Sequence, residues 1–422
     1  MADVSWFAGA GLGLFVHWDH ASQQGIEVSW PLVGRSIVHP GDKPDAVSVA
    51  KYHSTAATFN PLRWNATEVA RLARSCGARY VVFTTRHHSG YSMFHTKASD
   101  FSIQHSPYGA DITRQFIEAV RAEGLRVGLY YSLSDWHHPD YPAFQERYKP
   151  YLYERYPRPS PEKWARYLDY VRTQLTELLT NYGRIDLVWF DGHWERTAEE
   201  WRAAGLRRLV ASLQPDAIVN DRLPGNGDYD TPEQFLPITP PSRPWELCLT
   251  MNDSWGWRPS DTNYKSPRDL ARWLADAVSR GGNLLLNVSP QGDGSLPDVQ
   301  VSQLRDLGEW IATHGEAVIG ARPAPPSVDF YGPATVNNNR LYLHLVAQPV
   351  ENVVVRGIPV RRVRRVSLVG ADAPLHYRLP LAAYDDHLPG FDVLAELIID
   401  APTSSGALLE VIAIDFDRPL EV

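Results

Sequence analysis

The chain has 422 residues, of which 44% are hydrophobic and 21% charged, and a net charge of −8 without any basic block. These values are typical of a globular protein with one large domain and a smaller one, and they argue against nucleic acid or an anionic membrane surface as a partner. The 2 cysteines, Cys76 and Cys248, lie far apart and outside any C-x-x-C motif, so we expect no disulfide framework, and a reducing compartment is permitted.

The first residues, "MADVSWFAGAGLGLFVHW", have neither a basic start nor a clean apolar core. We therefore expect no secretory signal and a cytoplasmic location, with export by another route left open. No later apolar run has the length that a membrane-spanning helix needs.

Strand-like and helix-like segments alternate from residue 10 to about residue 315. The strand-like segments are near-continuous apolar runs, as expected for parallel strands that are covered on both faces. The helix-like segments repeat apolar residues at i, i+3 and i+4, and several begin with Ser, Thr, Asp or Asn. Such βα repeats favour a (β/α) barrel or an open doubly wound sheet. In chain order the segments are "GLGLFVHW", "NATEVARLARSCG", "RYVVFTTRHH", "DITRQFIEAVRAEG", "RVGLYYSL", residues 161–182, "DLVWFDG", "AEEWRAAGLRRLVASL", "AIVNDR", "WELCLTM", "SPRDLARWLADAVSRGG" and "NLLLNVS".

Polar residues close the apolar runs at their carboxyl ends. An open sheet would use only the strands near its switch point to build a site, whereas a closed barrel gathers all the carboxyl ends around one cavity. We therefore predict a TIM-like (β/α) barrel over residues 1–320. The closing residues are His17, the pair His87 and His88, Tyr130 or Tyr131, Asp191, Arg222, Glu246 and Asn287.

The pattern changes after the proline-rich segment "GARPAPPSVDFYGPA". Short strand-like runs then follow without helices, among them "RLYLHLV", "NVVVRGI", "RRVSLVG", "FDVLAELII" and "GALLEVIAID". This pattern favours an antiparallel β-sandwich over residues 321–422. Nothing in it concentrates chemistry, so we expect the barrel to carry the function.

Two acids lie beside tryptophans in apolar runs. Asp191 comes two residues after Trp189, and Glu246 comes directly after Trp245. A buried carboxylate is costly unless it is paired or used. Either acid alone could cap a helix or form a salt bridge, but two carboxylates on one barrel rim are what glycoside cleavage requires. We expect Glu195, which follows Asp191 in the next loop, to be a solvated acid.

Histidines at two strand ends, His17 and the pair His87 and His88, point to a hydroxyl-rich ligand or to a metal. A metal-dependent hydrolase on a barrel is therefore an alternative function. No histidine occurs between His193 and His314, so the later strands supply no such ligand. We expect neither a metal nor another cofactor.

All 14 tryptophans lie at or before Trp310. They can be core residues or platforms for apolar sugar faces. A carbohydrate-binding protein without catalysis would keep these groups, but the presence of both Asp191 and Glu246 argues against it. We place Trp30 and Trp257 among the candidate substrate contacts.

With these residues in place, the chain resembles the α-L-fucosidases of glycoside hydrolase family 29. The likeness covers most of residues 5–315, and the order of several motifs makes it specific. The resemblance implies a barrel followed by a β-sandwich, a retaining mechanism and no metal. The stretches that carry it are "WFAGAGLGLFVHW", "KYHSTAATFNP", "GARYVVFTTRHHSGYSMF", "VGLYYSLSDW", "YGRIDLVWFDG", "WELCLTMNDSWGW" and "GGNLLLNVSPQGDGSLP".

The resemblance also implies roles for single residues. Asp191, the acid of the "WFDG" motif, is similar to the family nucleophile. Two stretches depart from the family pattern: "HWDH" stands for the usual "HWG" and brings in Asp19 and His20, and "HHSG" stands for "HHDG" and brings in Ser89. The positions similar to those that hold the fucose ring are His17, His87, His88, Tyr130 or Tyr131, Trp189 and Arg222.

The acid/base is the least uniformly placed residue in such enzymes. We predict Glu246 for this role, with Asp253 and Asp19 as alternatives. The expected function is the hydrolysis of terminal α-L-fucosyl residues of a fucosylated oligosaccharide or glycoconjugate through a covalent glycosyl-enzyme. A related specificity, such as one for α-L-galactosides, is a further alternative. The linkage preference and the oligomeric state, a homo-oligomer included, stay open.

Overall fold

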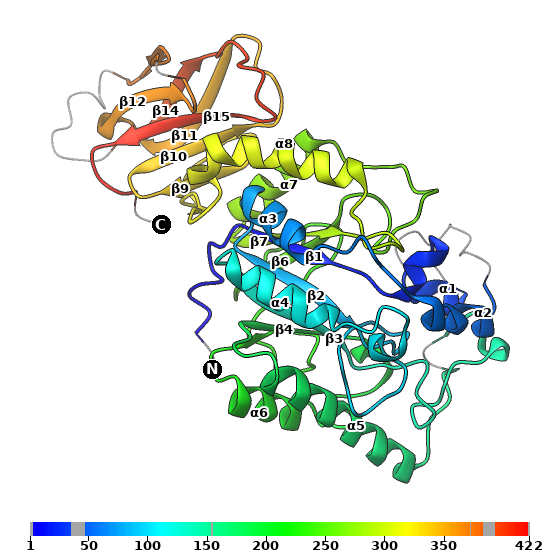
Figure 1. Ribbon diagram of the computed structural model, residues 1–422. Helices are drawn as coiled ribbons and strands as arrows, with labels where there is room; N and C mark the ends of the chain where they lie inside the picture. Colours follow the sequence, from blue (N-terminus) through cyan, green and yellow to red (C-terminus); the bar gives the residue numbers. More distant parts are fainter. Residues whose placement is uncertain (1–2, 35–46, 153–154, 372, 383–392, 421–422) are drawn as a thin grey trace.

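The structure, a computed structural model, describes residues 3–34, 47–152, 155–371, 373–382 and 393–420. Its larger part is a curled sheet of 7 strands in the order β5-β4-β3-β2-β1-β7-β6, with helices around the outside (Figure 1). Every pairing in this sheet is parallel. The strands are β1 (Leu12–Val16), β2 (Tyr80–Arg86), β3 (Arg126–Ser132), β4 (Leu187–Asp191), β5 (Ile218–Val219), β6 (Trp245–Thr250) and β7 (Gly282–Val288).

The helices that cover the sheet begin at residues that cap them. Asn65, Asp111, Ser160 and Ser266 each accept a hydrogen bond from the backbone N–H three residues further on, which satisfies a donor that the helix itself leaves unpaired. Within the described ranges, no helix is long and apolar enough to cross a membrane. The helices are α1 (Trp30–Val33), α2 (Val49–Ser54), α3 (Ala66–Ser75), α4 (Ile112–Ala122), α5 (Pro161–Thr180), α6 (Ala203–Leu213), α7 (Pro267–Ser279) and α8 (Asp298–His314).

A short segment closes the gap between β5 and β6. Residues 229–233 form parallel bridges with Asn220, which follows β5, and with Trp245 and Cys248 of β6. The curled sheet thereby becomes a ring whose strands all have their carboxyl ends on one side. This arrangement confirms the predicted TIM-like barrel.

The barrel interior is filled by large side chains that need a glycine beside them. Every residue of β1, β2, β4, β6 and β7 is buried, as near-continuous apolar runs predict for a sheet that is covered on both faces. In β1, a Cβ atom at Gly13 would lie only 2.3 Å from the Tyr80 ring. Only glycine at this position leaves room for the Tyr80 ring inside the barrel.

The C-terminal part consists of two antiparallel sheets, which confirms the predicted β-sandwich. Side chains of both sheets, such as Leu343 and Ile399, share one core. The sandwich lies beside α8 (Figure 1), where Trp310 Nε1 donates a hydrogen bond to the Leu409 carbonyl at 2.8 Å. The first residues of the predicted strand "FDVLAELII", residues 391–392, lie outside the described residues. One sheet contains β8 (Arg322–Pro323), β9 (Ala334–Asn337), β10 (Arg340–Leu345), β12 (Val363–Leu368) and β15 (Glu410–Phe416), and the other β11 (Asn352–Pro359), β13 (Tyr377–Arg378) and β14 (Leu394–Asp400).

Candidate active site

A cavity of about 220 Å³ lies at the carboxyl ends of the barrel strands. His17 directly follows β1, His87 and His88 directly follow β2, and Asp191 is the last residue of β4. The strand-end pattern in the sequence therefore identified side chains that the fold brings together. The residues that line the cavity are Phe15, His17, Trp30, His87, His88, Trp189, Asp191, Trp194, Arg222, Glu233, Cys248 and Trp255.

Asp191 is held by donors on both of its carboxylate oxygens. Arg222 Nη1 donates to Oδ1 at 3.0 Å, and the Tyr130 hydroxyl donates to Oδ2 at 2.8 Å. His88 Nε2 lies 3.7 Å from Oδ2. Burial alone would raise the pKa of Asp191, but the Arg222 guanidinium and its hydrogen bond outweigh burial and lower this pKa to about 2. Asp191 is thus a fixed carboxylate that is ionised at neutral pH.

Arg222 joins Asp191 to a second acid, Glu233. Its Nη2 donates to Glu233 Oε2 at 2.6 Å, while Nη1 holds Asp191. The guanidinium carbon lies 4.5 Å from the centre of the Trp189 ring, which adds a cation–π contact. Because the Glu233 side chain is 33% exposed and that of Asp191 only 10%, one acid lies at the mouth of the cavity and the other at its floor.

Sequence reasoning missed Glu233. This residue belongs to the segment that closes the ring, where it bridges Cys248 of β6. Its sequence, "YDTPEQF", contains a proline and no apolar run, so it carries none of the signals of a buried strand. Only the closure of the barrel brings Glu233 to the rim.

Glu246 lies elsewhere than the sequence pattern predicted. It is the second residue of β6, so the prediction that it closes its strand at the carboxyl end is wrong. The side chain is fully buried beneath the cavity and is not among the residues that line it. Its oxygens accept hydrogen bonds from the Tyr80 hydroxyl at 2.5 Å and from Trp189 Nε1 at 2.8 Å. Burial raises the pKa of Glu246 to about 7.

We expect Glu246→Gln to destabilise the protein by about 1–3 kcal/mol. Either the Tyr80 hydroxyl or Trp189 Nε1, which both donate to Glu246, would then face the amide NH₂ group of the glutamine inside the barrel. The free energy of unfolding in urea measures this loss. Glu199→Gln, in an exposed loop, is the matched control and should unfold like the wild type. Equal stability of the Glu246→Gln variant would show that the buried carboxyl group does not hold Tyr80 and Trp189.

The cavity histidines are neutral and each has a fixed partner. His17 Nδ1 lies 2.7 Å from Asn287 Oδ1, and His88 Nδ1 lies 2.7 Å from the Ser132 hydroxyl. Burial lowers the pKa of His17 to about 3 and that of His88 to about 4. Within the parts of the chain that the structure describes, no group of three or more His, Cys, Asp or Glu side chains is arranged to hold a metal ion.

These histidines predict a loss of stability in acid. Burial lowers the pKa of His17, His87 and His88 in the folded protein, so between these values and the pKa of about 6.5 in the unfolded chain, only the unfolded state binds the proton. Their contribution is therefore complete above pH 6.5 and is lost as the pH falls below it, by up to about 1.4 kcal/mol per pH unit for each histidine. Burial raises the pKa of Glu27 and Glu246 in the folded protein, so as the pH falls the folded state takes up protons at these acids before the unfolded state does. This effect stabilises the folded protein and offsets part of the loss.

The measurement is the free energy of unfolding between pH 7 and pH 5, for the wild type and for His88→Gln. We expect a steep decrease for the wild type and a flatter one for the variant, whereas His376→Gln, at an exposed position in the C-terminal sandwich, should behave like the wild type. Parallel curves for all three proteins would refute this prediction. Since Asp191 keeps its charge down to a pKa of about 2, activity in this range should fall with unfolding and not with protonation of Asp191.

Three of the predicted substrate contacts, Tyr130, Tyr131 and Trp257, do not line the cavity. Of the two tyrosines in β3, Tyr130 holds Asp191, while the Tyr131 hydroxyl donates to Gln174 of α5 at 3.0 Å. Successive residues of a strand point to opposite faces, so only one of the pair can face the interior. Trp257 is half-buried and does not line the cavity. Trp255 takes that place, with its ring centre 4.8 Å from that of His17.

The two alternative acids, Asp19 and Asp253, do not line the cavity either. Asp19 is 1% exposed and caps a 3-10 turn by accepting the N–H of Ala21 at 2.8 Å. Asp253 accepts a hydrogen bond from Asn263 Nδ2 at 2.9 Å. Both acids therefore shape loops at the rim of the barrel.

Glu195 is buried, not solvated as the sequence suggested. It is 4% exposed, and it accepts hydrogen bonds from Trp136 Nε1 at 3.0 Å and from the hydroxyls of Tyr141 and Tyr151. Burial raises its pKa. These bonds anchor the loop after β4, which brings Trp194, a residue that sequence reasoning missed, into the cavity wall.

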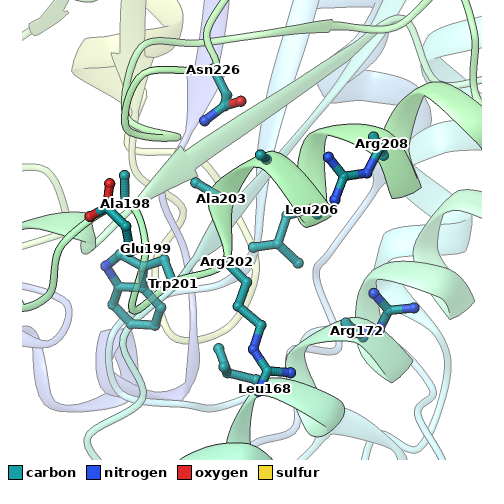
Figure 2. Close-up of a pocket in the computed structure, with 12 residues that line it drawn as sticks. Leu168, Arg172, Ala198, Glu199, Trp201, Arg202, Ala203, Leu206, Arg208 and Asn226 are labelled. Atoms are coloured by element: carbon teal, nitrogen blue, oxygen red, sulfur yellow. The ribbon is translucent and has the colours of Figure 1, made fainter.

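A larger hollow of about 460 Å³ lies away from these residues, between α5 and α6. Figure 2 shows Arg172 on α5 and Arg202 and Arg208 at α6 around it. It contains none of the residues that the sequence assigned to a site. The chemistry is therefore concentrated in the smaller cavity at the strand ends.

Comparisons with known proteins agree on one family. A family model described as "Alpha-L-fucosidase" matches residues 2–316. The chain is 30% identical to the tissue alpha-L-fucosidase of Bos taurus over 342 residues, which are 76% of this chain and 69% of that protein. Among solved structures, alpha-L-fucosidase isoenzyme 1 of Paenibacillus thiaminolyticus is 31% identical and superposes with a TM-score of 0.85 over 98% of both chains.

A second solved structure adds a ligand to this comparison. It is a Thermotoga maritima alpha-L-fucosynthase in complex with alpha-L-Fuc-(1-2)-beta-L-Fuc-N3, which is 25% identical, with a TM-score of 0.74 over 97% of this chain and 96% of that one. The family model, the curated relative and the solved structures all confirm the resemblance seen in the sequence motifs. The chain therefore belongs to the alpha-L-fucosidase family of glycoside hydrolases.

Proposed function

We propose that this chain is a retaining, exo-acting α-L-fucosidase that releases terminal α-L-fucose from fucosylated glycans. The observation that carries the proposal is the pair Asp191 and Glu233, whose carboxyl groups are held by the two terminal nitrogens of the Arg222 guanidinium. Hydrolysis of a glycoside with retention needs two carboxyl groups about 5–5.5 Å apart. The fucosyl ligand of the Thermotoga maritima relative supports fucose as the sugar.

In the first step Asp191 is the nucleophile. A carboxylate oxygen forms a bond to the anomeric carbon while the bond from that carbon to the leaving oxygen breaks. Glu233, the more exposed acid at the mouth of the cavity, gives its proton to the leaving oxygen as general acid. This assigns Glu233, and not Glu246, as the acid/base, because Glu246 is sealed beneath the cavity.

In the second step water releases the sugar. After the first step Asp191 is esterified and uncharged, and Glu233, which has given up its proton, is a carboxylate. The Glu233 carboxylate takes a proton from water, the water oxygen attacks the anomeric carbon, and the bond to Asp191 breaks. Two inversions at one carbon give net retention.

The remaining cavity residues suit a deoxy sugar. His17 and His88 present neutral ring nitrogens to hydroxyl groups, and Phe15, Trp189 and Trp255 form an apolar wall that fits the methyl group of fucose. An apolar pocket rejects an added hydroxyl group by only about 10²-fold. An α-L-galactoside is therefore the appropriate competitor in any assay of specificity.

The stereochemistry of the first product tests the proposal. We expect ¹H NMR of the wild-type protein with an aryl α-L-fucoside to show α-L-fucose first and the β anomer only after mutarotation. β-L-Fucose as the first product would mean inversion and would overturn the two-step mechanism. A panel of 1,2-, 1,3-, 1,4- and 1,6-linked fucosides, with an aryl α-L-galactoside, then defines the substrate.

Chelation separates the alternative functions. A retaining glycosidase should keep its full rate after dialysis against EDTA, whereas a metal-dependent hydrolase should lose it and regain it when the metal returns. Binding of fucosides without any turnover would instead support a carbohydrate-binding protein without catalysis.

A further inference from the structure

A continuous chain of hydrogen bonds runs from Asp19 to the cavity residue His87. The Ser89 hydroxyl donates to Asp19 Oδ2 at 3.0 Å, and the Ser89 N–H donates to the Ser29 hydroxyl oxygen at 2.8 Å. The Ser29 hydroxyl oxygen lies 2.5 Å from His87 Nδ1. These residues are between 0% and 4% exposed, so water does not compete for these bonds.

Asp19 determines the direction of the hydrogen bonds in this network. The Asp19 carboxylate can only accept, and it takes the N–H of Ala21 on Oδ1 and the Ser89 hydroxyl on Oδ2. This bond fixes residue 89, whose N–H occupies one lone pair of the Ser29 oxygen. The hydroxyl hydrogen of Ser29 is then free to be donated to His87 Nδ1, the nitrogen that it faces.

The Tyr52 hydroxyl is the competing group beside the two serines. It interacts with both Ser29 and Ser89, but its own hydrogen is donated to the Val28 carbonyl at 2.8 Å. The Tyr52 hydroxyl therefore has no hydrogen left to donate to Ser29 or Ser89. The short contact between Ser29 and His87 makes the imidazole the better acceptor for the Ser29 hydrogen.

The tautomer of His87 decides what it offers to a ligand. Burial lowers the pKa of His87 well below its usual value, so the ring is neutral and has one donor and one acceptor nitrogen. If Nδ1 accepts from Ser29, the ring hydrogen is on Nε2. His87 lines the cavity, and Nε2 is then a donor for a substrate oxygen.

We propose that Asp19 is a positioning residue which, through Ser89 and Ser29, holds His87 in the tautomer that donates its Nε2 hydrogen into the cavity. The proposal rests on the proposed function only in taking the acceptor to be a sugar hydroxyl. It also connects Asp19 and Ser89, the two positions at which the "HWDH" and "HHSG" stretches depart from the family pattern, through one hydrogen bond.

The first test is Asp19→Asn. The amide offers one acceptor oxygen for two donors, Ala21 N–H and the Ser89 hydroxyl, so the Ser89 hydroxyl either loses its acceptor or must turn to accept from the amide NH₂ group. We expect KM for an aryl α-L-fucoside to rise about fivefold to tenfold, the effect of one hydrogen bond, with kcat changed less than twofold because the contact is made in both ground and transition states. Asp253→Asn, at the other rim aspartate, is the matched control and should keep the wild-type KM.

An exchange variant separates positioning from mere folding. Asp19→Ser combined with Ser89→Asp moves the carboxyl group to the other end of the same hydrogen bond, so KM should return to within about twofold of the wild type. Should the Asp19→Asn protein fail to fold, Ser29→Ala removes the group in contact with His87 and leaves Asp19 intact. An unchanged KM in Ser29→Ala would overturn the proposal.

A spectroscopic readout is independent of catalysis. In ¹⁵N NMR of histidine-labelled protein, with His87 assigned by its loss in His87→Gln, we expect a single Nε2–H tautomer in the wild type and a mixture in Asp19→Asn. The same tautomer in both proteins would refute the inference. If the wild type hydrolysed no fucoside, the proposed function would fail, while this spectrum would still decide the role of Asp19.

Discussion

Asp191→Gly should lose at least about 10⁴-fold in kcat on aryl α-L-fucosides while it stays folded. The size of the effect follows from the removal of the proposed nucleophile, because losses of about 10⁴- to 10⁶-fold accompany removal of a central catalytic group. The fold should survive, since Asp191 is the last residue of β4 and its two strong partners, Arg222 and Tyr130, keep other contacts in the barrel.

Azide makes this prediction specific to a nucleophile. In Asp191→Gly the anion can enter the space of the lost carboxylate and attack the anomeric carbon once, so the product should be β-L-fucosyl azide, the inverted configuration. An α-configured azide would mean that a second protein nucleophile had formed the intermediate. In the wild type, a 2-deoxy-2-fluoro-fucosyl fluoride should label the peptide that contains Asp191, and a label on any other residue would contradict the assignment.

The sequence predicted the barrel because its strands are buried on both faces. Near-continuous apolar runs identified β1, β2, β4 and β7 without any knowledge of the fold. The residue that ends such a run is also visible in the sequence, and in a closed barrel the carboxyl ends of the strands surround one common cavity. For this reason Asp191, His17 and the histidine pair after β2 could be predicted.

The sequence could not predict which acid lies opposite Asp191. Glu246 and Asp191 both stand beside a tryptophan in an apolar run, but the strand of Glu246 starts only one residue before it. Strand boundaries are the least reliable part of such a prediction, and a shift along the strand by a few residues moves a side chain from the rim to the sealed interior. Glu233 is at the rim through the bridges of an irregular segment, for which no periodic signal exists.

The choice between neighbouring aromatic residues has a similar cause. Tyr130 and Tyr131 are equivalent in composition, and only the phase of β3 relative to its neighbours decides which of them meets Asp191. For Trp255 and Trp257 there is no strand phase at all, because both lie in the loop that follows β6. Glu27, from the loop after β1, accepts the backbone N–H groups of Trp255 and Gly256 at 2.7 and 2.9 Å, and so fixes which tryptophan reaches the cavity.

Glu233→Ala should separate substrates by their leaving groups. On fucosylated oligosaccharides, whose leaving oxygen needs a proton, we expect kcat/KM to fall about 10²- to 10⁴-fold, the usual contribution of general acid catalysis. On an aryl fucoside with an acidic phenol, kcat/KM should fall by less than about tenfold, since this leaving group departs without a proton. In the proposed mechanism, hydrolysis of the glycosyl-enzyme also needs Glu233 as base, so the intermediate should accumulate and give a burst of phenol.

Azide also tests the role of Glu233, but here the expected product has the retained configuration and not the inverted one. In Glu233→Ala the covalent bond to Asp191 still forms, and azide attacks that intermediate without needing a general base. The product should therefore be α-L-fucosyl azide, with retained configuration and a restored rate.

Glu246→Gln is the control for this assignment: the variant should lose stability, but its activity should fall by the same factor on both substrate classes. If Glu246→Gln instead spared only activated aryl fucosides, and Glu233→Ala did not, the acid/base would be Glu246 after all. The barrel would then have to open beneath Trp189 to let a substrate reach a side chain that is fully buried in this structure.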